Sequence, residues 1–143
     1  MTEIAFHFNV PDKLTYSCRL LRKAYLSGAK VVVTAEPGVL AELDTLLWGF
    51  CATEFVPHCT TGASLSTLSA TPVVLAESLA GCPHHDVLVN LTAQVQAEFA
   101  QFARVVEVVS STDEMDRQEA RMRWRDYEAR GFSIIRHDLN LKG

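Results

Sequence analysis

A chain of 143 residues with 48% hydrophobic and 21% charged residues has the length and composition of one globular domain with its own hydrophobic core. Its formal net charge of −4 and its lack of a basic tail argue against general binding to a nucleic-acid backbone. No apolar run approaches the ~20 residues of a membrane span, and the N-terminus has no signal-peptide pattern. We therefore expect a cytoplasmic single domain over residues 1–143.

Two strand–helix units are predicted in the first third of the chain. Apolar residues alternate over 4–8, which predicts a strand, and apolar residues at helical spacing follow between 12 and 28. The β-branched run at 30–35 predicts a strand covered on both faces. Residues 37–49 have the spacing of a second helix, with a proline in its first turn and a glycine at its end.

The middle of the chain predicts two more strands after a loop. Residues 60–71 are small and polar without periodicity, which predicts an irregular connection. Short apolar runs at 73–77 and 87–91 predict buried strands.

The last third predicts two helices and two strands. Val95, Phe99, Phe102 and Val106 recur at helical spacing, so a helix is predicted before a strand at 105–109. An arginine-rich helix then covers residues 113–130, and a final strand follows at 132–139. This alternation predicts a three-layer α/β/α single domain with a mostly parallel central sheet.

Nucleotide and metal sites have no clear signature. The first strand leads into NVPDKL rather than a glycine-rich phosphate loop, and the sequence has no GxGxxG, GxxxxGK[ST] or GxSxG motif. Cys59, Cys82, His84 and His85 are residue types that ligate zinc, but they do not form two tight ligand pairs. The four cysteines also lack a CxxC pair and are expected to be reduced. The sequence predicts no cofactor, no metal and no catalytic centre.

The arginine-rich helix carries five of the 13 Lys+Arg residues of the chain. At ~100° per residue, Arg117, Arg121 and Arg125 lie within about 80° of one another with Trp124 beside them. Two interpretations stay open from the spacing alone: a solvated helix with internal ion pairs, or a surface that binds an acidic peptide with an apolar end. The residues expected to face the core are Met115, Met122 and Ala129.

Two motifs give the chain a recognisable resemblance. LLWGFCATEFVPH (46–58) and RMRWRDYEARGFSI (121–134), the latter preceded by VVEVV, together resemble the chi subunit of bacterial DNA polymerase III holoenzyme. The resemblance implies a non-enzymatic adaptor of the clamp-loader complex. It also implies three partners: the small psi subunit, the acidic C-terminal tail of single-stranded DNA-binding protein, and a repair helicase that uses the psi surface.

Two sets of residues follow from the resemblance. The tail of single-stranded DNA-binding protein is expected to contact six residues, in which Trp48, Val109 and Trp124 bury the apolar end and Arg121 holds the terminal carboxylate, with Arg117 and Arg125 around it. Trp124 stands where the family often has tyrosine, and Arg117 and Arg125 stand where lysine is common. The psi subunit is expected to contact an exposed apolar patch made of Phe55, Val56, Pro57 and His58.

Two other functions are alternatives to the adaptor. One is a small α/β nucleotide-binding or hydrolytic protein with an unrecognised site. The other is a direct nucleic-acid binder, which the acidic net charge disfavours.

Overall fold

The computed structural model describes residues 2–49, 56–60, 64–79 and 82–139. Its described strands form one sheet in the order β3-β4-β2-β5-β6-β1-β7, and every pair of neighbouring strands is parallel. The strands are β1 (Glu3–Val10), β2 (Val31–Thr34), β3 (His58–Thr60), β4 (Val73–Ala76), β5 (Val87–Asn90), β6 (Arg104–Ser110) and β7 (Ile134–Asp138).

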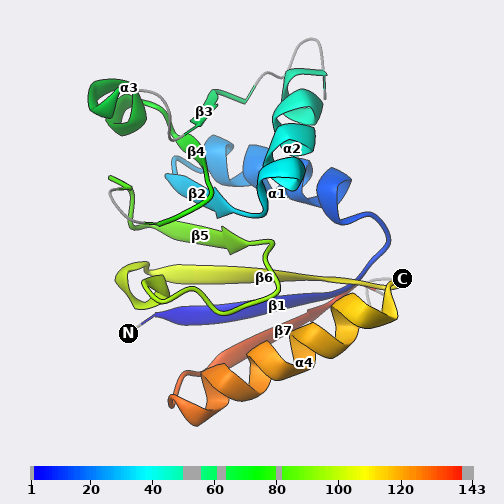
Figure 1. Cartoon of the computed structure of the whole chain (residues 1–143). Coiled ribbons are helices and arrows are strands. Elements are labelled where there is room, and N and C mark those ends of the chain that lie inside the picture. The colour runs from blue at the N-terminus through cyan, green and yellow to red at the C-terminus, as the bar shows by residue number, and fades with distance from the viewer. Residues whose placement is uncertain (1, 50–55, 61–63, 80–81, 140–143) are drawn as a thin grey trace.

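Helices cover both faces of this sheet (Figure 1). The helices α1 (Lys13–Leu26) and α2 (Pro37–Gly49) pack on one face, in a core with Val31, Val33 and Val106. The helix α4 (Glu114–Ala129) and the short 3-10 helix η1 (Phe99–Gln101) pack on the other face. A short helix, α3 (Leu65–Ala70), lies beside β3. The predicted three-layer α/β/α fold with a parallel sheet is confirmed.

The central strands are apolar on both faces because both faces are covered. Every residue of β2 and of β4 is buried, and these strands read VVVT and VVLA. β-branched side chains fill a pleated surface well, so a continuous apolar run of this kind is stable only between two helical layers.

An irregularity near the end of β1 decides which face its last side chains occupy. Asn9 has φ of 60°, a left-handed conformation that Asn tolerates better than most residues, and the pairing with β6 shifts between His7 and Val10. Phe8, which precedes Asn9, follows the strand alternation onto the α4 face with Ile4 and Phe6. Val10, which follows Asn9, turns to the core under α1 and α2.

Two of the predicted elements are wrong. Residues 95–103 contain only the 3-10 helix η1, and Val106 lies in β6. Phe99 and Phe102 pack in the core on the α4 face, whereas Val106 packs in the core under α1 and α2, so the helical spacing of these residues does not come from one helix. The region 60–71, predicted to be an irregular loop, contains α3, which Ser64 caps by accepting a hydrogen bond from the Thr67 amide.

Candidate protein-binding site

A buried polar network holds α4 against the sheet. Glu107, fully buried on β6, accepts hydrogen bonds from Arg123 Nε at 2.9 Å, Tyr127 Oη at 2.7 Å and Asn90 Nδ2 at 3.0 Å. Arg123 also donates from Nη1 to the carbonyl oxygen of Ala93 at 3.3 Å. An ion pair out of contact with water requires this degree of hydrogen bonding, so the network fixes the rotation of α4 about its axis.

Burial also shifts the acidities in this network. Desolvation raises the pKa of the Glu107 carboxyl above its usual value, against the opposing effect of the Arg123 guanidinium and the hydrogen bonds. Desolvation and the neighbouring Glu107 carboxylate both raise the pKa of Tyr127. Tyr127 therefore stays a hydrogen-bond donor to Glu107.

The inward face of α4 differs from the predicted one. Its buried residues are Ala120, Arg123 and Tyr127, whereas Met122 is 70% exposed and Met115 is similarly exposed. The prediction that methionines face the core is wrong because the carboxylate of Glu107 on the facing strand requires the Arg123 cation as its partner. Arg123 therefore does not belong to the exposed arginines of this helix.

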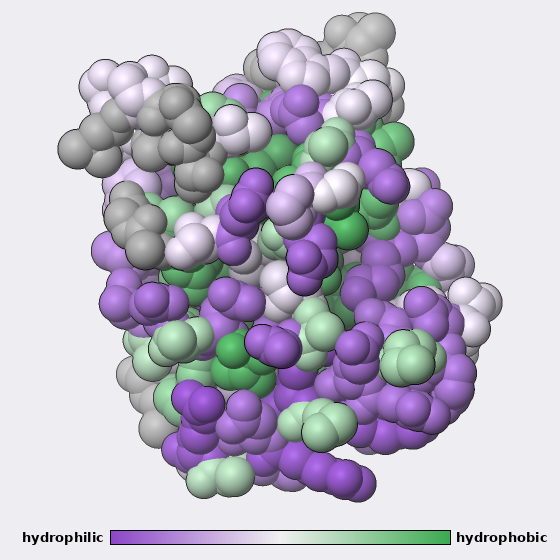
Figure 2. All heavy atoms as spheres, viewed as in Figure 1, coloured by the Kyte–Doolittle hydropathy of each residue, from purple (hydrophilic) through white to green (hydrophobic). Residues whose placement is uncertain are grey.

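A groove runs between α4 and the β1–β7 edge of the sheet. It has two hollows, of about 340 and 320 Å³, whose linings share Phe8, Arg121 and Arg136. We call the two together the arginine groove. The first, the indole hollow, is also lined by Ala120, Trp124, Arg125 and Glu128; the second, the strand hollow, is also lined by Asn9, Val109, Ser110, Arg117 and Asp138. Figure 2 shows hydrophilic residues gathered over the lower part of the molecule, where α4 lies.

Aromatic rings form one wall and the floor of the arginine groove. The half-buried indole of Trp124 packs against Phe6 and Phe8, with ring centroids 5.0 and 5.9 Å apart. The guanidinium of Arg136 lies over the Phe8 ring, 5.1 Å from its centroid, at the distance of a cation–π contact. The groove thus offers apolar surface directly beside fixed positive charge.

The arginines of the groove are largely free of carboxylate partners. In the part of the chain that the structure describes, Arg117, Arg125 and Arg136 form no ion pair. Arg121 pairs with Glu114 only at 3.7 Å, between two exposed side chains, a geometry that contributes little. Unpaired guanidiniums retain their donors for an external carboxylate.

Five of the six residues predicted to contact the acidic tail line this groove, and one does not. Val109, Arg117, Arg121, Trp124 and Arg125 lie along it. The predicted single pocket that joins Trp48 to Arg121 is not formed, because α2 and α4 pack on opposite faces of the sheet (Figure 1). Trp48 is 64% exposed at the end of α2 and lies against the ring of His58, with centroids 5.2 Å apart.

The residues predicted to contact the psi subunit are only partly exposed. Val56 is buried in the core under α2, so its predicted place in an exposed patch is wrong. The His58 side chain is only 1% exposed, and its ring nitrogens lie 2.8 Å from the Val56 carbonyl oxygen and 2.9 Å from an Asp44 carboxylate oxygen. Pro57 is half-buried, and Phe55 lies outside the described residues.

Exposed apolar surface near these residues comes from α2 instead. Leu46 and Trp48 are two of the large apolar side chains that the described structure leaves exposed. We call Trp48 and Pro57, the residue before the His58 that Trp48 contacts, the α2 patch.

Phe8 and Arg136 line both hollows, yet the motifs of the sequence do not single them out. Phe8 follows the strand alternation as an ordinary core residue on the face of Ile4 and Phe6, and nothing in the sequence distinguishes it from them as a groove residue. Arg136 lies in β7, and only the parallel pairing of β7 with β1 brings it next to Phe8. A search for cations at the alternating positions of the last strand would have found it.

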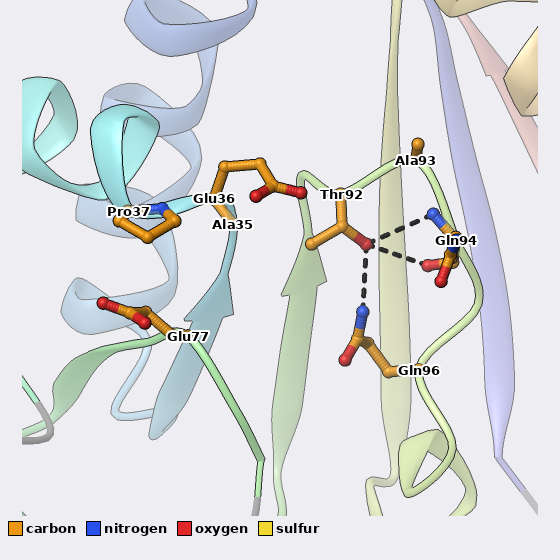
Figure 3. Close-up of a pocket in the computed structure, with 8 residues that line it drawn as sticks. All are labelled: Ala35, Glu36, Pro37, Glu77, Thr92, Ala93, Gln94 and Gln96. Carbon is orange, nitrogen blue, oxygen red and sulfur yellow. Dashed lines mark hydrogen bonds between the residues drawn. The ribbon is translucent and has the colours of Figure 1, made fainter.

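A further hollow lies at the carboxyl ends of β2, β4 and β5, where ligands of open α/β sheets commonly bind. Figure 3 shows that it is lined by Glu36 and Glu77 and by Thr92, whose hydroxyl bonds with Gln94 and Gln96. Two carboxylates at this position repel a phosphate group, so the hollow does not suit a nucleotide.

The candidate zinc residues have structural neighbours. His84 is buried, and its Nε2 lies 2.6 Å from the Thr71 carbonyl oxygen, while His85 makes an edge contact with Phe102. Cys18, Cys59 and Cys82 are free thiols. Burial raises the pKa of the Cys82 thiol above its usual value, and it raises the pKa of Cys18 to about 11. Among the described helices, none has the length and apolar character to cross a bilayer.

The fold and the groove define a small parallel α/β protein with a cationic groove that has an aromatic floor. The family model of the DNA polymerase III chi subunit, HolC, matches residues 1–135, and the chain belongs to this family.

Three bacterial proteins named DNA polymerase III subunit chi are similar to it. The Pseudomonas aeruginosa protein is 34% identical over 97% of this chain and 98% of its own length. The Escherichia coli protein is 31% identical over 82% of this chain and 79% of its own length, and the Haemophilus influenzae protein is 28% identical over 82% and 81%.

Proposed function

We propose that this protein is a non-catalytic adaptor of the DNA polymerase III holoenzyme in the bacterial cytoplasm, which joins the psi subunit of the clamp loader to the acidic tail of single-stranded DNA-binding protein. The observation that carries the proposal is the arginine groove in a chain of this family. Three guanidiniums that form no ion pair among the described residues surround an aromatic floor on a protein of net charge −4. Such a groove suits a short acidic peptide with an apolar end better than it suits a nucleic-acid backbone.

The groove divides the recognition of such a tail between its parts. Trp124 and Phe8 bury the apolar side chain of the last residue, and Arg121 holds the terminal carboxylate beside them. Arg117 lines only the strand hollow and Arg125 only the indole hollow, so they attract the upstream aspartates from either end. The contacts of Arg117 and Arg125 with these aspartates are exposed to solvent and weaken as the salt concentration rises.

The psi subunit binds, in this proposal, at the α2 patch. A tryptophan that is 64% exposed is unusual on a free surface and typical of the centre of a protein interface. His58 takes part indirectly, because its ring, hydrogen-bonded to Asp44, makes an edge contact with the indole of Trp48. A repair helicase that competes with psi is expected to use the same patch.

Calorimetric titration of two single variants tests this arrangement. Arg121→Ala is expected to weaken an Asp-rich peptide that ends in Phe by at least about tenfold, since a charge-assisted hydrogen bond contributes roughly 1.5–3 kcal/mol, and to leave psi binding unchanged. Trp48→Ala is expected to weaken psi and to leave the peptide unchanged. The two-surface proposal is wrong if both variants weaken both partners equally.

The matched peptide control removes only the terminal phenylalanine. Its binding is expected to fall strongly, because the groove floor is aromatic. Bare single-stranded DNA is expected not to shift in a gel with the wild-type protein unless the coating protein is present. The nucleotide-binding or hydrolytic alternative predicts instead a thermal shift with nucleotides that Arg121→Ala retains.

A further inference from the structure

Arg136 occupies a position in the arginine groove that the motifs of the helix do not reveal. It projects from β7, the edge strand of the sheet, whereas Arg117, Arg121 and Arg125 all project from α4. Arg136 lines both hollows, and so does Arg121. We call the part of the groove that the two hollows share the junction. Arg121 reaches the junction from α4, and Arg136 reaches it from β7.

The floor of this junction is the ring of Phe8. Phe8 is the third residue common to both hollows, and the Arg136 guanidinium lies over its ring at 5.1 Å from the centroid. This contact holds an otherwise exposed side chain in place before any ligand arrives, which reduces the entropy lost on binding.

A peptide that ends in an apolar residue presents its carboxylate and its last side chain from one Cα atom. The carboxylate must therefore lie next to the apolar contact, within a few ångströms. In the arginine groove, the junction is the place where an aromatic floor and two guanidiniums from facing elements meet. A carboxylate has two oxygens and about four acceptor sites, so one guanidinium does not exhaust it.

We propose that Arg136 is the second guanidinium of the terminal-carboxylate site, so that Arg121 on α4 and Arg136 on β7 hold the C-terminal carboxylate of an acidic peptide between them above Phe8. This inference rests on the proposed binding of an acidic tail. It makes the site a clamp between a helix and an edge strand rather than a surface of α4 alone. It also assigns Arg117 and Arg125, which each line one hollow, to side-chain carboxylates.

Calorimetry with two forms of one peptide tests the clamp. The probe is a synthetic Asp-rich peptide that ends in Phe, made with a free terminal carboxylate and with a terminal amide. Arg136→Gln is expected to weaken the free-acid peptide about tenfold and to change the amide peptide little. Arg136→Lys, which keeps the charge and loses the fork, is expected to fall between wild type and Arg136→Gln.

The matched control is Arg130→Gln. Arg130 is also an exposed arginine near the end of α4, but it pairs with Asp126 at 2.8 Å and lines neither hollow. Its loss removes the same charge and is expected to leave the preference for the free acid over the amide intact. The double variant Arg121→Gln with Arg136→Gln is expected to lose less than the product of the single losses, because both contact one carboxylate.

Two results separate the clamp from the proposed function. If wild-type protein binds neither peptide, the proposed tail binding is itself wrong. If wild type prefers the free acid and Arg136→Gln keeps that preference, or weakens both peptides equally, tail binding stands and the clamp is overturned.

Discussion

Arg123 and Glu107 lie in the apolar space between α4 and β6, where an unpaired charge is costly. Arg123→Met removes the cation and leaves the Glu107 carboxylate buried without its partner. We expect this change to lower the free energy of unfolding by about 3 kcal/mol or more. Combined with Glu107→Gln, it is expected to cost much less, because the buried charge is then gone as well. Urea denaturation of the three variants and wild type measures both effects.

The same pair makes stability depend on pH. Burial raises the pKa of Glu107 above 4.5, so the folded protein keeps this proton to a higher pH than the unfolded chain does. The folded state then binds more protons, and the stability contributed by Glu107 falls as pH rises from 4.5 through the folded-state pKa. Glu107→Gln is expected to remove this dependence of stability on pH. Arg123→Met is expected to extend it to higher pH, because the Arg123 charge opposes the rise in the pKa of Glu107. Denaturation midpoints over this range measure the slope.

At the scale of single elements, α4 is defined by its two ends. Asp113 caps its first turn by accepting a hydrogen bond from the Asp116 amide, and Gly131 ends it with φ of 85°. Two backbone hydrogen bonds close the helix at this turn: the Gly131 amide donates to the Glu128 carbonyl oxygen, and the Phe132 amide donates to the Tyr127 carbonyl oxygen. This turn sets the direction in which β7 leaves, and therefore where Arg136 lies.

A pair of glycine substitutions tests this point. Gly131→Ala is expected to destabilise the fold by about 1 kcal/mol, because only glycine adopts a positive φ without steric cost. Gly38→Ala, in the first turn of α2 with open space around the new Cβ atom, is expected to be neutral or stabilising by up to about 1 kcal/mol. If the two substitutions lower the thermal unfolding temperature equally, glycine at position 131 is not required for the C-terminal turn of α4.

The contrast between predicted and observed elements has a physical cause. The strands at 30–35, 73–77 and 87–91 are predictable because burial on both faces requires continuous β-branched runs. The predicted helix over 95–106 fails because its apolar residues come from the segment around η1 and from β6, with Phe99 and Phe102 in one core and Val106 in the other. The prediction of which face of α4 is buried fails for a related reason. Glu107, which lies on a strand distant in sequence, needs a cationic partner, so α4 buries Arg123 and leaves Met122 exposed.

Most of the groove residues that the sequence predicts lie on one helix, and the family resemblance adds Val109 on β6. Arg117, Arg121, Trp124 and Arg125 share a helix, so their spacing places them on one side of it. Trp48 was grouped with them incorrectly, since the face of the sheet that a helix covers depends on the strand order. Arg136 enters the groove only through the pairing of β7 with β1.

At the scale of the whole molecule, charge is distributed unevenly. A chain of net charge −4 carries four arginines along one groove, so its overall charge repels an acidic peptide while the groove attracts it. We expect peptide affinity to fall as salt rises and to fall less steeply in Arg117→Gln or Arg125→Gln, because exposed charges are screened beyond about 8–10 Å. Trp124→Ala is expected to lower affinity with an unchanged salt slope. Titration at several ionic strengths separates the two kinds of variant.

The two proposed surfaces lie on opposite faces of one sheet. The α2 patch belongs to the layer of α1 and α2, and the arginine groove to the layer of α4, with separate apolar cores beneath them. Coupling between two such sites requires an element with two discrete arrangements, and the strands between these layers are hydrogen-bonded to one another in one parallel sheet.

We therefore expect the psi subunit and the acidic peptide to bind independently. The dissociation constant of the peptide, measured by calorimetry on the free protein and on its complex with psi, is expected to agree within about twofold, which corresponds to less than roughly 0.5 kcal/mol of coupling. Linkage is reciprocal, so psi affinity measured with and without saturating peptide must give the same answer. A tenfold change in either direction would mean that the sheet transmits binding between its faces, and the adaptor would then act as a switch and not as a passive tether.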